Sequence, residues 1–419
     1  MKMKKLLAAV LAAACFLGTT GCASQNAAQT IAANDLTKNV KKAEQTVCLD
    51  EDARNHTIEA QTTFGVKLLQ NEMEKANPLI SPLSIASALS MTANGAVGET
   101  KAQMEEVLGA NAETLSSVFA ARQASKKDDK QLKLANSIWF KDTPTLHVED
   151  AFLQKNADCF GAGIYAAPFD DSTKTAINDW VKGNTDGMIP EILDEIPDDA
   201  VMYLVNALAF DAKWEDIFET TQVHTGRFTS REGVEQTGDF LYGETGKFLT
   251  CEHAEGFLKY YEGQKYAFAA LLPEEGMEIS EFVSGLTGEE LHAILTSPQS
   301  ESVEFGLPKF KTEFSSELSE NLKSLGMTDA FDGEKADFSA LGSSDEGNIL
   351  ISRVLHKTFI QVDEAGTKAG AATAVDMVTE SAAVYPHSVY LERPFVYMIV
   401  DMETKLPVFL GALTELPEV

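Results

Sequence analysis

The stretch EAGTKAGAATAVDMVTESAAVYP, residues 364–386, joins two apolar runs that are typical of strands. TFIQVD (358–363) precedes it, and RPFVYMIVD lies beyond it at residues 393–401. Connections within compact domains usually span about 4–6 residues, and much longer ones tend to be functional or disordered. A connection this long, rich in Ala, Thr and Gly, therefore needs an explanation of its own.

Three interpretations of this stretch are open. Its alanines favour a short surface helix, although Gly366 and Gly370 weaken it. A flexible linker is the second, although the stretch carries few charges for a linker. The third is a strand, because alternate residues then separate into two faces. The face without charges is small or apolar and consists of Thr367, Ala369, Ala371, Thr373, Val375 and Met377. The stretch is thus compatible with a strand that buries one face, although it occupies a loop.

The whole chain is long and acidic. It has 419 residues, 44% of them apolar, so it can bury a large core. No Pro-, Gly- or Ser-rich linker divides it, and we expect one domain over residues 57–419. Its formal net charge of −30 argues against binding to nucleic acid, or to anionic lipid surfaces through charge.

The N-terminal residues predict export. Three lysines precede an apolar run over residues 6–17 that is too short to span a membrane, so we predict a signal peptide over residues 1–21. GTTGC (18–22) resembles a bacterial lipobox, in which Cys22 is lipidated after cleavage, although Thr19 stands where a branched aliphatic residue is commoner. We expect a lipid-anchored polar tether over residues 22–56 and a lipoprotein on the extracytoplasmic side of a bacterial membrane, which it contacts only through the lipid. Ordinary secretion is the alternative.

No sequence motif indicates an enzyme. The chain contains no G-x-S-x-G, H-E-x-x-H or C-x-x-C. GETGKF (243–248) is superficially similar to a phosphate loop, but it is too short, and Phe248 stands where Ser or Thr would hold magnesium. The seven histidines show no metal-ligand spacing. We therefore expect no catalytic residue, no metal and no cofactor.

A series of longer segments carries a resemblance to a known family. They are NPLISPLSIASALSMTANGAVGETKAQMEEVLG (77–109), LKLANSIWF (132–140), INDWVKGNTDGMIPEIL (177–193), LVNALAFDAKWEDIF (204–218), VEFGLPKFKTEF (303–314), LHKTFIQVDEAGTKAGAATA (355–374) and RPFVYMIVDMETKLPVFLGAL (393–413). Together, in this order, they resemble the serpin family, and the resemblance covers residues 57–417. It implies an α+β fold with three β-sheets, about nine helices and an exposed reactive-centre loop near residues 364–392.

The resemblance also implies a function for the long loop. A serine protease cuts it, forms an acyl-enzyme and is trapped as a covalent complex when the loop inserts as a central strand of the largest sheet. The protease supplies the chemistry, so the chain is expected to be a monomeric suicide-substrate inhibitor and not an enzyme. The alternatives are a serpin-fold carrier or chaperone that does not inhibit, and an unrelated lipoprotein such as a solute receptor.

The composition of the loop hinge favours the inhibitor. Bulky, charged or Pro residues on the inner face would block insertion, since Pro cannot serve a central ladder. Gly366 is expected to provide backbone freedom, and Lys368, where family members often carry Glu, is expected to face outward. The hinge carried over from the family consists of Glu364, Gly366, Thr367, Ala369, Ala371, Ala372 and Thr373.

The resemblance places two further clusters at the opening of the sheet. The shutter, a polar cluster beneath the centre of the sheet, consists of Ser81, Ser84, Asn206 and His356. The breach, where insertion begins, carries Trp214. The residues alone leave simpler interpretations open, because the two serines could only cap a helix and Trp214 could be an ordinary core residue.

The scissile bond is expected about seventeen residues along from the hinge glutamate. This count predicts Glu380–Ser381, with Val378, Thr379 and Ala382 as alternatives after a small shift. The small, uncharged surroundings favour an elastase-like or subtilisin-like target slightly over a Glu-specific one. A trypsin-like target is disfavoured, because no Lys or Arg lies between Lys368 and Arg393.

Overall fold

The computed structural model describes residues 33–43, 50–126, 129–197, 200–345, 347–367 and 385–417. All of them belong to one unit, residues 32–419. Within these ranges the chain forms nine α-helices, three large sheets and a two-stranded ribbon of β15 (Gly342–Ser343) and β4 (His147–Val148). The predicted α+β fold with three sheets and about nine helices is confirmed.

The largest sheet has eight strands. Its order is β1-β5-β3-β6-β16-β17-β7, and β14 pairs with the other edge of β16. Strand β6 is buried at every position, which explains its long apolar run, whereas one face of β16 is only partly buried. The strands are β1 (Asn34–Asp35), β3 (Leu132–Lys141), β5 (Gly163–Ala167), β6 (Met202–Phe210), β7 (Ala212–Lys213), β14 (Phe310–Glu317), β16 (Arg353–Val362) and β17 (Gly366–Thr367).

The second and third sheets hold the later strands of the chain. The six-stranded sheet consists, in order, of β10 (Phe248–Cys251), β11 (Ala254–Tyr260), β12 (Tyr266–Pro273), β19 (Phe395–Asp401), β20 (Leu406–Leu413) and β2 (Leu79–Ile80). The four-stranded sheet consists of β18 (His387–Tyr390), β13 (Val303–Pro308), β9 (Glu235–Thr245) and β8 (Val223–Thr229). The two apolar runs on either side of the long loop therefore belong to different sheets, because β16 lies in the first and β19 in the second.

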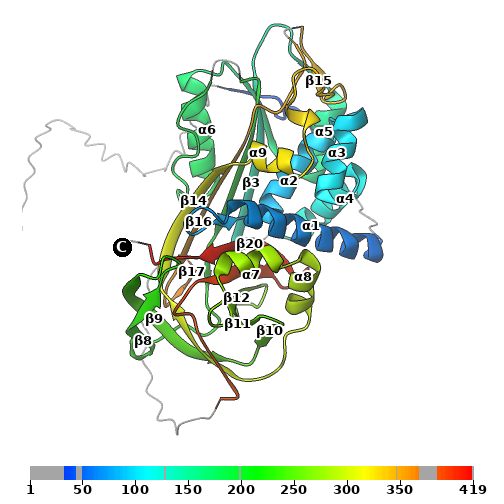
Figure 1. Cartoon of the computed structure of the whole chain (residues 1–419). Coiled ribbons are helices and arrows are strands. Elements are labelled where there is room, and N and C mark those ends of the chain that lie inside the picture. The colour runs from blue at the N-terminus through cyan, green and yellow to red at the C-terminus, as the bar shows by residue number, and fades with distance from the viewer. Residues whose placement is uncertain are drawn as a thin grey trace, which may run out of the picture. The chain divides into compact units, whose positions relative to one another are not determined.

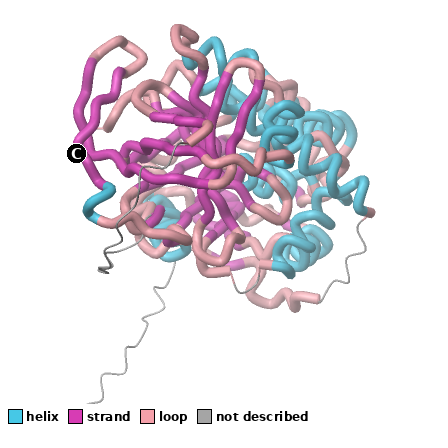
Figure 2. Tube along the Cα trace, turned by 90° about the horizontal axis from the view of Figure 1, so that it is seen from below, coloured by secondary structure: helices cyan, strands magenta, loops and turns pink. Residues whose placement is uncertain are grey.

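The helices cover the sheets unevenly (Figures 1 and 2), and most of them lie to one side of the strands. Helices α1 and α7 contact β20 and β19 respectively, while α2 lies between β20 and β6 and is buried throughout. Within the described ranges, no helix is long and apolar enough to cross a membrane. The helices are α1 (Glu51–Glu72), α2 (Pro82–Ala93), α3 (Gly98–Leu108), α4 (Ala112–Ser125), α5 (Asp150–Cys159), α6 (Asp171–Asn184), α7 (Ile279–Gly285), α8 (Gly288–Thr296) and α9 (Ser319–Ser324), with 3₁₀ turns η1 (Thr220–Gln222) and η2 (Asp329–Phe331).

The start of the folded part differs from the prediction. Residues 22–56 were expected to be a polar tether, but β1 pairs with β5 through Asn34↔Ala166 and Asp35↔Tyr165. Helix α1 begins at Glu51, where the Asp50 side chain accepts a hydrogen bond from the backbone N–H of Ala53. Asn34 and Asp35 show no apolar periodicity in the sequence, so only their pairing with the edge strand β5 shows that they are structured.

Candidate functional site

The long loop begins inside the largest sheet. Strands β6 and β16 pair in parallel from Arg353↔Tyr203 to Thr358↔Leu208. Beyond that point β17, Gly366–Thr367, lies between β16 and β7 and is antiparallel to both, through Val362↔Thr367 and Thr367↔Ala212. The first residues of the loop are therefore already a short strand in the gap between β16 and the continuation of β6.

A tight turn at Asp363 directs the chain into this gap. The Asp363 carboxylate accepts hydrogen bonds from the backbone N–H groups of Ala365 (2.9 Å) and Gly366 (3.2 Å). The Asp363 N–H in turn donates to the Gly366 carbonyl (3.0 Å). Burial raises the pKa of the Asp363 carboxyl, and the two N–H donors oppose that rise. The turn reverses the chain at the end of β16 without a positive φ at Gly366.

Gly366 is required for a reason that the sequence interpretation did not identify. We expected it to provide backbone freedom, but its φ lies outside the left-handed region. A Cβ at this position would lie 2.1 Å from the carbonyl oxygen of Ala212 and 2.7 Å from the Cα of Lys213. The close approach of β7 therefore excludes any side chain here, which is the second common reason for glycine in a strand.

Aromatic side chains hold the next residue. Thr367 is fully buried, and its hydroxyl lies 2.6 Å from that of Tyr261. The Tyr261 ring stacks on Trp214 with a centroid distance of 4.5 Å. Trp214 also donates from Nε1 to the Asp363 carbonyl (2.8 Å) and from its backbone N–H to the Ala365 carbonyl (3.0 Å). Trp214 is thus bonded directly to the turn that begins the loop, which an ordinary core tryptophan would not be.

Glu364 anchors the outer side of the turn. Its carboxylate forms an ion pair with Lys309 at 2.7 Å, and its carbonyl accepts from the backbone N–H of Phe218 at 2.9 Å. The hydrogen bond from Lys309 lowers the pKa of the Glu364 carboxyl. The carboxylate is half-exposed, so this ion pair contributes little stability and serves mainly to fix a position.

A polar cluster lies beneath the centre of the same sheet. The backbone N–H of Ser81 donates to His356 Nε2 (3.1 Å), so Nε2 is unprotonated. His356 Nδ1 therefore carries the proton and donates it to Asn206 Oδ1 (2.8 Å), and Asn206 Nδ2 donates to Asn136 Oδ1 (2.8 Å). Burial lowers the pKa of His356 to about 3, which keeps the ring neutral. This chain of hydrogen bonds joins α2, β16, β6 and β3.

The two serines of the cluster have different parts in it. Ser81 is the N-cap of α2, and its hydroxyl accepts from the Ser84 N–H at 3.2 Å. Ser81 therefore both caps α2 and belongs to the cluster, because its own backbone N–H donates to His356. The Ser84 hydroxyl is buried without a hydrogen-bond partner among the described residues, so Ser84 joins only through its backbone.

The far end of the loop attaches to another sheet. Strand β18 pairs in parallel with β13 from Val303↔His387 to Gly306↔Tyr390. The Tyr385 hydroxyl donates to the Glu244 carboxylate, and His387 Nε2 lies 2.6 Å from a Glu301 oxygen. The loop thus begins in the eight-stranded sheet and ends on the four-stranded one, so its two ends are fixed to separate structures.

Comparisons with known proteins decide the family. The family model described as serpin (serine protease inhibitor) matches residues 59–416. The chain belongs to the serpin family. Plasma serine protease inhibitor of Bos taurus is 33% identical over 354 residues, covering 81% of this chain and 85% of that protein. Leukocyte elastase inhibitor of Homo sapiens is 32% identical over 381 residues, covering 84% and 97%.

Solved serpin structures indicate which conformation this chain has. The native state of the thermophilic serpin tengpin superposes with a TM-score of 0.86 at 42% identity, covering 92% of this chain and all of that one. Its latent state gives a TM-score of 0.77 at 43% identity, covering 90% and 100%. The described part of this serpin therefore resembles a native serpin more than a latent one.

The structure brings together only some of the residues expected at the site. Ser81, Asn206 and His356 meet in the central cluster, and Glu364, Gly366, Thr367 and Trp214 meet at the start of the loop. Within the described ranges, no group of three His, Cys, Asp or Glu residues could hold a metal. Ser84 reaches the cluster only through its backbone N–H. The other expected residues lie outside the described ranges: Cys22, Ala369, Ala371, Ala372, Thr373, Val378, Thr379, Glu380, Ser381 and Ala382.

Four residues of this serpin's site were missed from the sequence. Asn136 extends the central cluster, and an Asn within an apolar strand was a usable signal, since buried polar groups need partners. Thr358 also lies below the sheet, where its hydroxyl donates to the Leu79 carbonyl at 2.8 Å. Tyr261 and Lys309 have no such signal, because only the fold brings them to Thr367 and Glu364.

Proposed function

We propose that this serpin inhibits serine proteases as a suicide substrate, by inserting its cleaved loop between β6 and β16. Serpins are protease inhibitors and not catalytic enzymes, and the relatives named above carry inhibitor names. The observation that carries the mechanism for this chain is β17, which already occupies the gap between β16 and β7. Insertion then needs only to extend an existing strand.

Extending β17 gives a definite register for the loop. Both of its ladders are antiparallel, through Val362↔Thr367 on one side and Ala212↔Thr367 on the other. Continued along β16 and β6, these two ladders place Thr373 opposite His356 and Asn206 at once. His356 and Asn206 are themselves paired across the closed sheet. The two independent ladders therefore agree on one position for the incoming strand.

In this register the inner face of the loop complements its future neighbours. Small Ala369 would lie between Ile360 and Phe210, and Ala371 between Thr358 and Leu208. Thr373 would be the first polar inner residue after Thr367 and would meet the polar pair of the central cluster. Matching small residues with large ones and polar groups with polar ones is what a packed sheet interior requires.

Insertion also offers a net gain of backbone pairing. The closed sheet has one parallel ladder between β6 and β16, which spans Arg353–Thr358 on the β16 side. An inserted strand replaces it with two antiparallel ladders, and antiparallel pairing is slightly more stable per residue. The uncut loop cannot extend far into the gap, because its other end is fixed at β18. Cleavage removes that constraint, which accounts for a metastable native form.

The same register bears on the scissile bond. Met377 would lie opposite Met202 and Ser352, where β6 begins and where the Ser352 N–H donates to the Met202 carbonyl (3.1 Å). Residues beyond Met377 would emerge from the far end of the sheet. This supports cleavage at Glu380–Ser381, or near Val378, Thr379 or Ala382, because the trapped ester must remain outside. An elastase-like or subtilisin-like target fits these residues, and one relative is named an elastase inhibitor.

The test is incubation of the purified chain with an elastase-like, a subtilisin-like and a Glu-specific protease, followed by a denaturing gel. We expect a covalent complex that survives boiling in detergent with at least one of them. Mass spectrometry of the released C-terminal peptide should show that it begins between residues 379 and 383. If every protease cuts the loop and leaves unharmed, and cutting does not raise the thermal midpoint, the chain is a carrier and not an inhibitor.

We further propose that the inhibitor acts as a monomer outside the cell, anchored by lipid at Cys22. The support is the lipobox-like GTTGC over residues 18–22 and the high negative charge of the chain. An anchored inhibitor would protect the surface of its own cell against proteases arriving from outside.

A further inference from the structure

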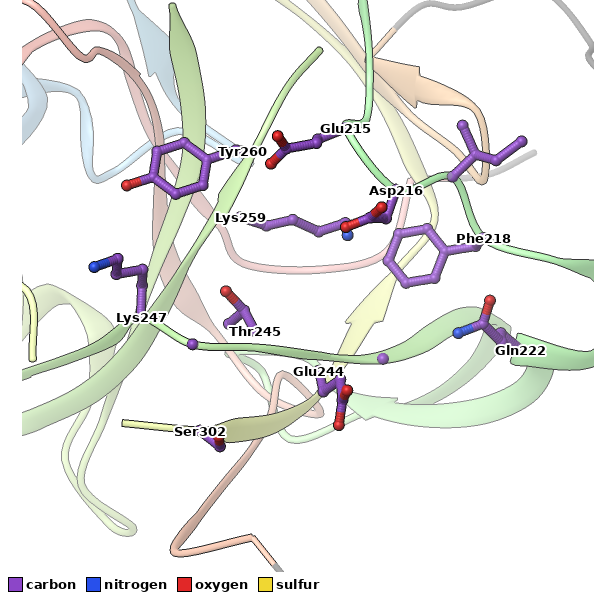
Figure 3. A pocket seen from close by; sticks show the side chains of 13 residues that line it. Glu215, Asp216, Phe218, Gln222, Glu244, Thr245, Lys247, Lys259, Tyr260 and Ser302 are labelled. Carbon is purple, nitrogen blue, oxygen red and sulfur yellow. The ribbon is translucent and has the colours of Figure 1, made fainter. Parts of the chain in front are cut away.

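A cavity of about 480 Å³ lies beside the turn that begins the loop (Figure 3). Its lining consists of residues 215–218 after β7, residues 243–247 from the end of β9 to the start of β10, Lys259 with Tyr260 at the end of β11, and the single residues Gln222 and Ser302. Residues 243–247 are GETGK, the sequence that superficially resembles a phosphate loop. The cavity has the size of a small-molecule site, and the inhibitory mechanism does not use it.

Lys259 is the unusual residue of this cavity. Its side chain is only 8% exposed, yet it lines the cavity and crosses it in Figure 3. Its ammonium lies 4.8 Å from the centroid of the Phe218 ring and 5.8 Å from that of Trp214. Among the described residues it has neither a hydrogen bond nor an ion pair within 4.0 Å. A nearly buried cation without a counter-ion is costly, and burial accordingly lowers the pKa of Lys259.

Carboxylates surround this ammonium without pairing with it. Asp216 and Glu215 act on Lys259 electrostatically, and both are exposed at the cavity. The Glu215 carboxylate accepts from Gln264 Nε2 (2.6 Å), and that of Glu244 accepts from the Tyr385 hydroxyl. Three carboxylates outnumber the two lysines of the lining, Lys259 and Lys247, and so disfavour a phosphate or another multiply charged anion. A simple cation would in turn be repelled by Lys259, so neither kind of ion suits both halves of the cavity.

We propose that this cavity binds a small zwitterion of the amino-acid type. The ligand's carboxylate would pair with the Lys259 ammonium, and its amine with the carboxylates of Asp216 and Glu215. Such a ligand supplies the counter-ion that Lys259 lacks and compensates the acidic rim at the same time. The ring of Phe218 and the side chain of Ile217 leave apolar wall for a small side chain.

Binding here would act on the loop, a consequence that rests on the proposed function. The backbone N–H of Phe218, on the cavity wall, donates to the Glu364 carbonyl, and the neighbouring Trp214 donates to the carbonyls of Asp363 and Ala365. A ligand that binds the native form more tightly than the inserted one stabilises the native form by that difference. The zwitterion would then regulate how readily the hinge inserts.

The test uses the intact, uncleaved chain without protease, so its failure leaves the inhibitory mechanism untouched. Binding of glycine, L-alanine and L-serine is measured by calorimetry and by thermal midpoint, with sodium acetate and methylammonium chloride as single-charge probes. We expect at least one amino acid to bind at least tenfold more tightly than either probe. The proposal is overturned if acetate binds as tightly as the amino acids. It is also overturned if no amino acid binds at concentrations up to about 100 mM, which corresponds to a very weak affinity.

Variants then assign the binding to the cavity. Lys259→Met keeps the unbranched shape and all but the last atom of the side chain, removes its charge, and should abolish binding. Lys311→Met is the matched control, because Lys311 also lies over a ring, that of Phe359 at 5.5 Å, but outside the cavity. If Lys259→Met fails to fold, the exposed variants Asp216→Asn and Glu215→Gln decide, and should each weaken binding at least threefold. Unchanged binding in both would refute the site.

Discussion

The substitution Thr373→Val tests the register proposed for the inserted loop. Valine keeps the shape of threonine and removes only its hydroxyl. In the closed sheet His356 Nδ1 donates to Asn206 Oδ1 at 2.8 Å, and neither group needs the loop. In the inserted state residue 373 would stand between them, so only that state should be affected by the change.

The size of the effect follows from strand spacing. One additional strand moves β6 and β16 apart by about 4.8 Å, so the gap between the two atoms becomes roughly 7.6 Å. No direct hydrogen bond spans that distance, and two hydrogen bonds through one hydroxyl span only about 6 Å, so the Thr373 hydroxyl can pair with one of the two groups. Valine would leave that buried group unsatisfied, at about 1–3 kcal/mol. We expect the loop-cleaved variant to lose about 1–3 kcal/mol relative to cleaved wild type.

The assay is guanidinium unfolding of the intact and the loop-cleaved forms, for wild type, Thr373→Val and Thr373→Ser. The serine variant keeps the hydroxyl and should retain most of the stability that cleavage adds. The comparison of cleaved with intact protein removes any effect that is common to both states. If cleaved Thr373→Val matches cleaved wild type within about 0.5 kcal/mol, the residue 373 hydroxyl does not bind to the cluster and the register is wrong.

Three further predictions follow from the hinge, the central cluster and the N-terminal segment. Thr367→Arg should turn the inhibitor into a substrate, because Thr367 is fully buried and an unpaired buried charge costs several kcal/mol. Lys368→Arg, on the face expected to point outward, is the control, and similar stoichiometries of inhibition for the two variants would contradict the assignment of faces. The pKa of His356 is lowered to about 3 in the folded state, below the unfolded value of about 6.5, so the free energy of unfolding of the native form should fall by about 2 kcal/mol between neutral pH and pH 5. A His356→Gln variant with the same acid dependence would show that another group is responsible. Wild type expressed in a bacterial host should incorporate a fatty-acid label that Cys22→Ala does not, and an unlabelled wild type would refute lipidation.

The fold and the location of the site could be predicted from the chain because they depend on local patterns. Ser81 and Ser84 before an apolar run predicted a capped helix, and the helix lies where the shutter was expected. The alternation of residues along the loop predicted that Thr367 lies on the buried face, and Thr367 is fully buried. The polar segment before residue 56 was described wrongly in part, since β1 depends on a partner strand more than a hundred residues away. Pairing of that kind leaves no periodic pattern in a two-residue strand.

The sequence by itself determined the family, the long connection and its small inner face, because composition and alternation are properties of consecutive residues. The tertiary structure alone decided what that face meets. Gly366 is required by Ala212, Thr367 is held by Tyr261, and Glu364 is paired with Lys309, all across separations in the chain that no local pattern encodes. The unpaired ammonium of Lys259 likewise became visible only when β11 and the segment after β7 enclosed it. Burial and pairing belong to the packed molecule, so they decide which of the residues suggested by the sequence form the site.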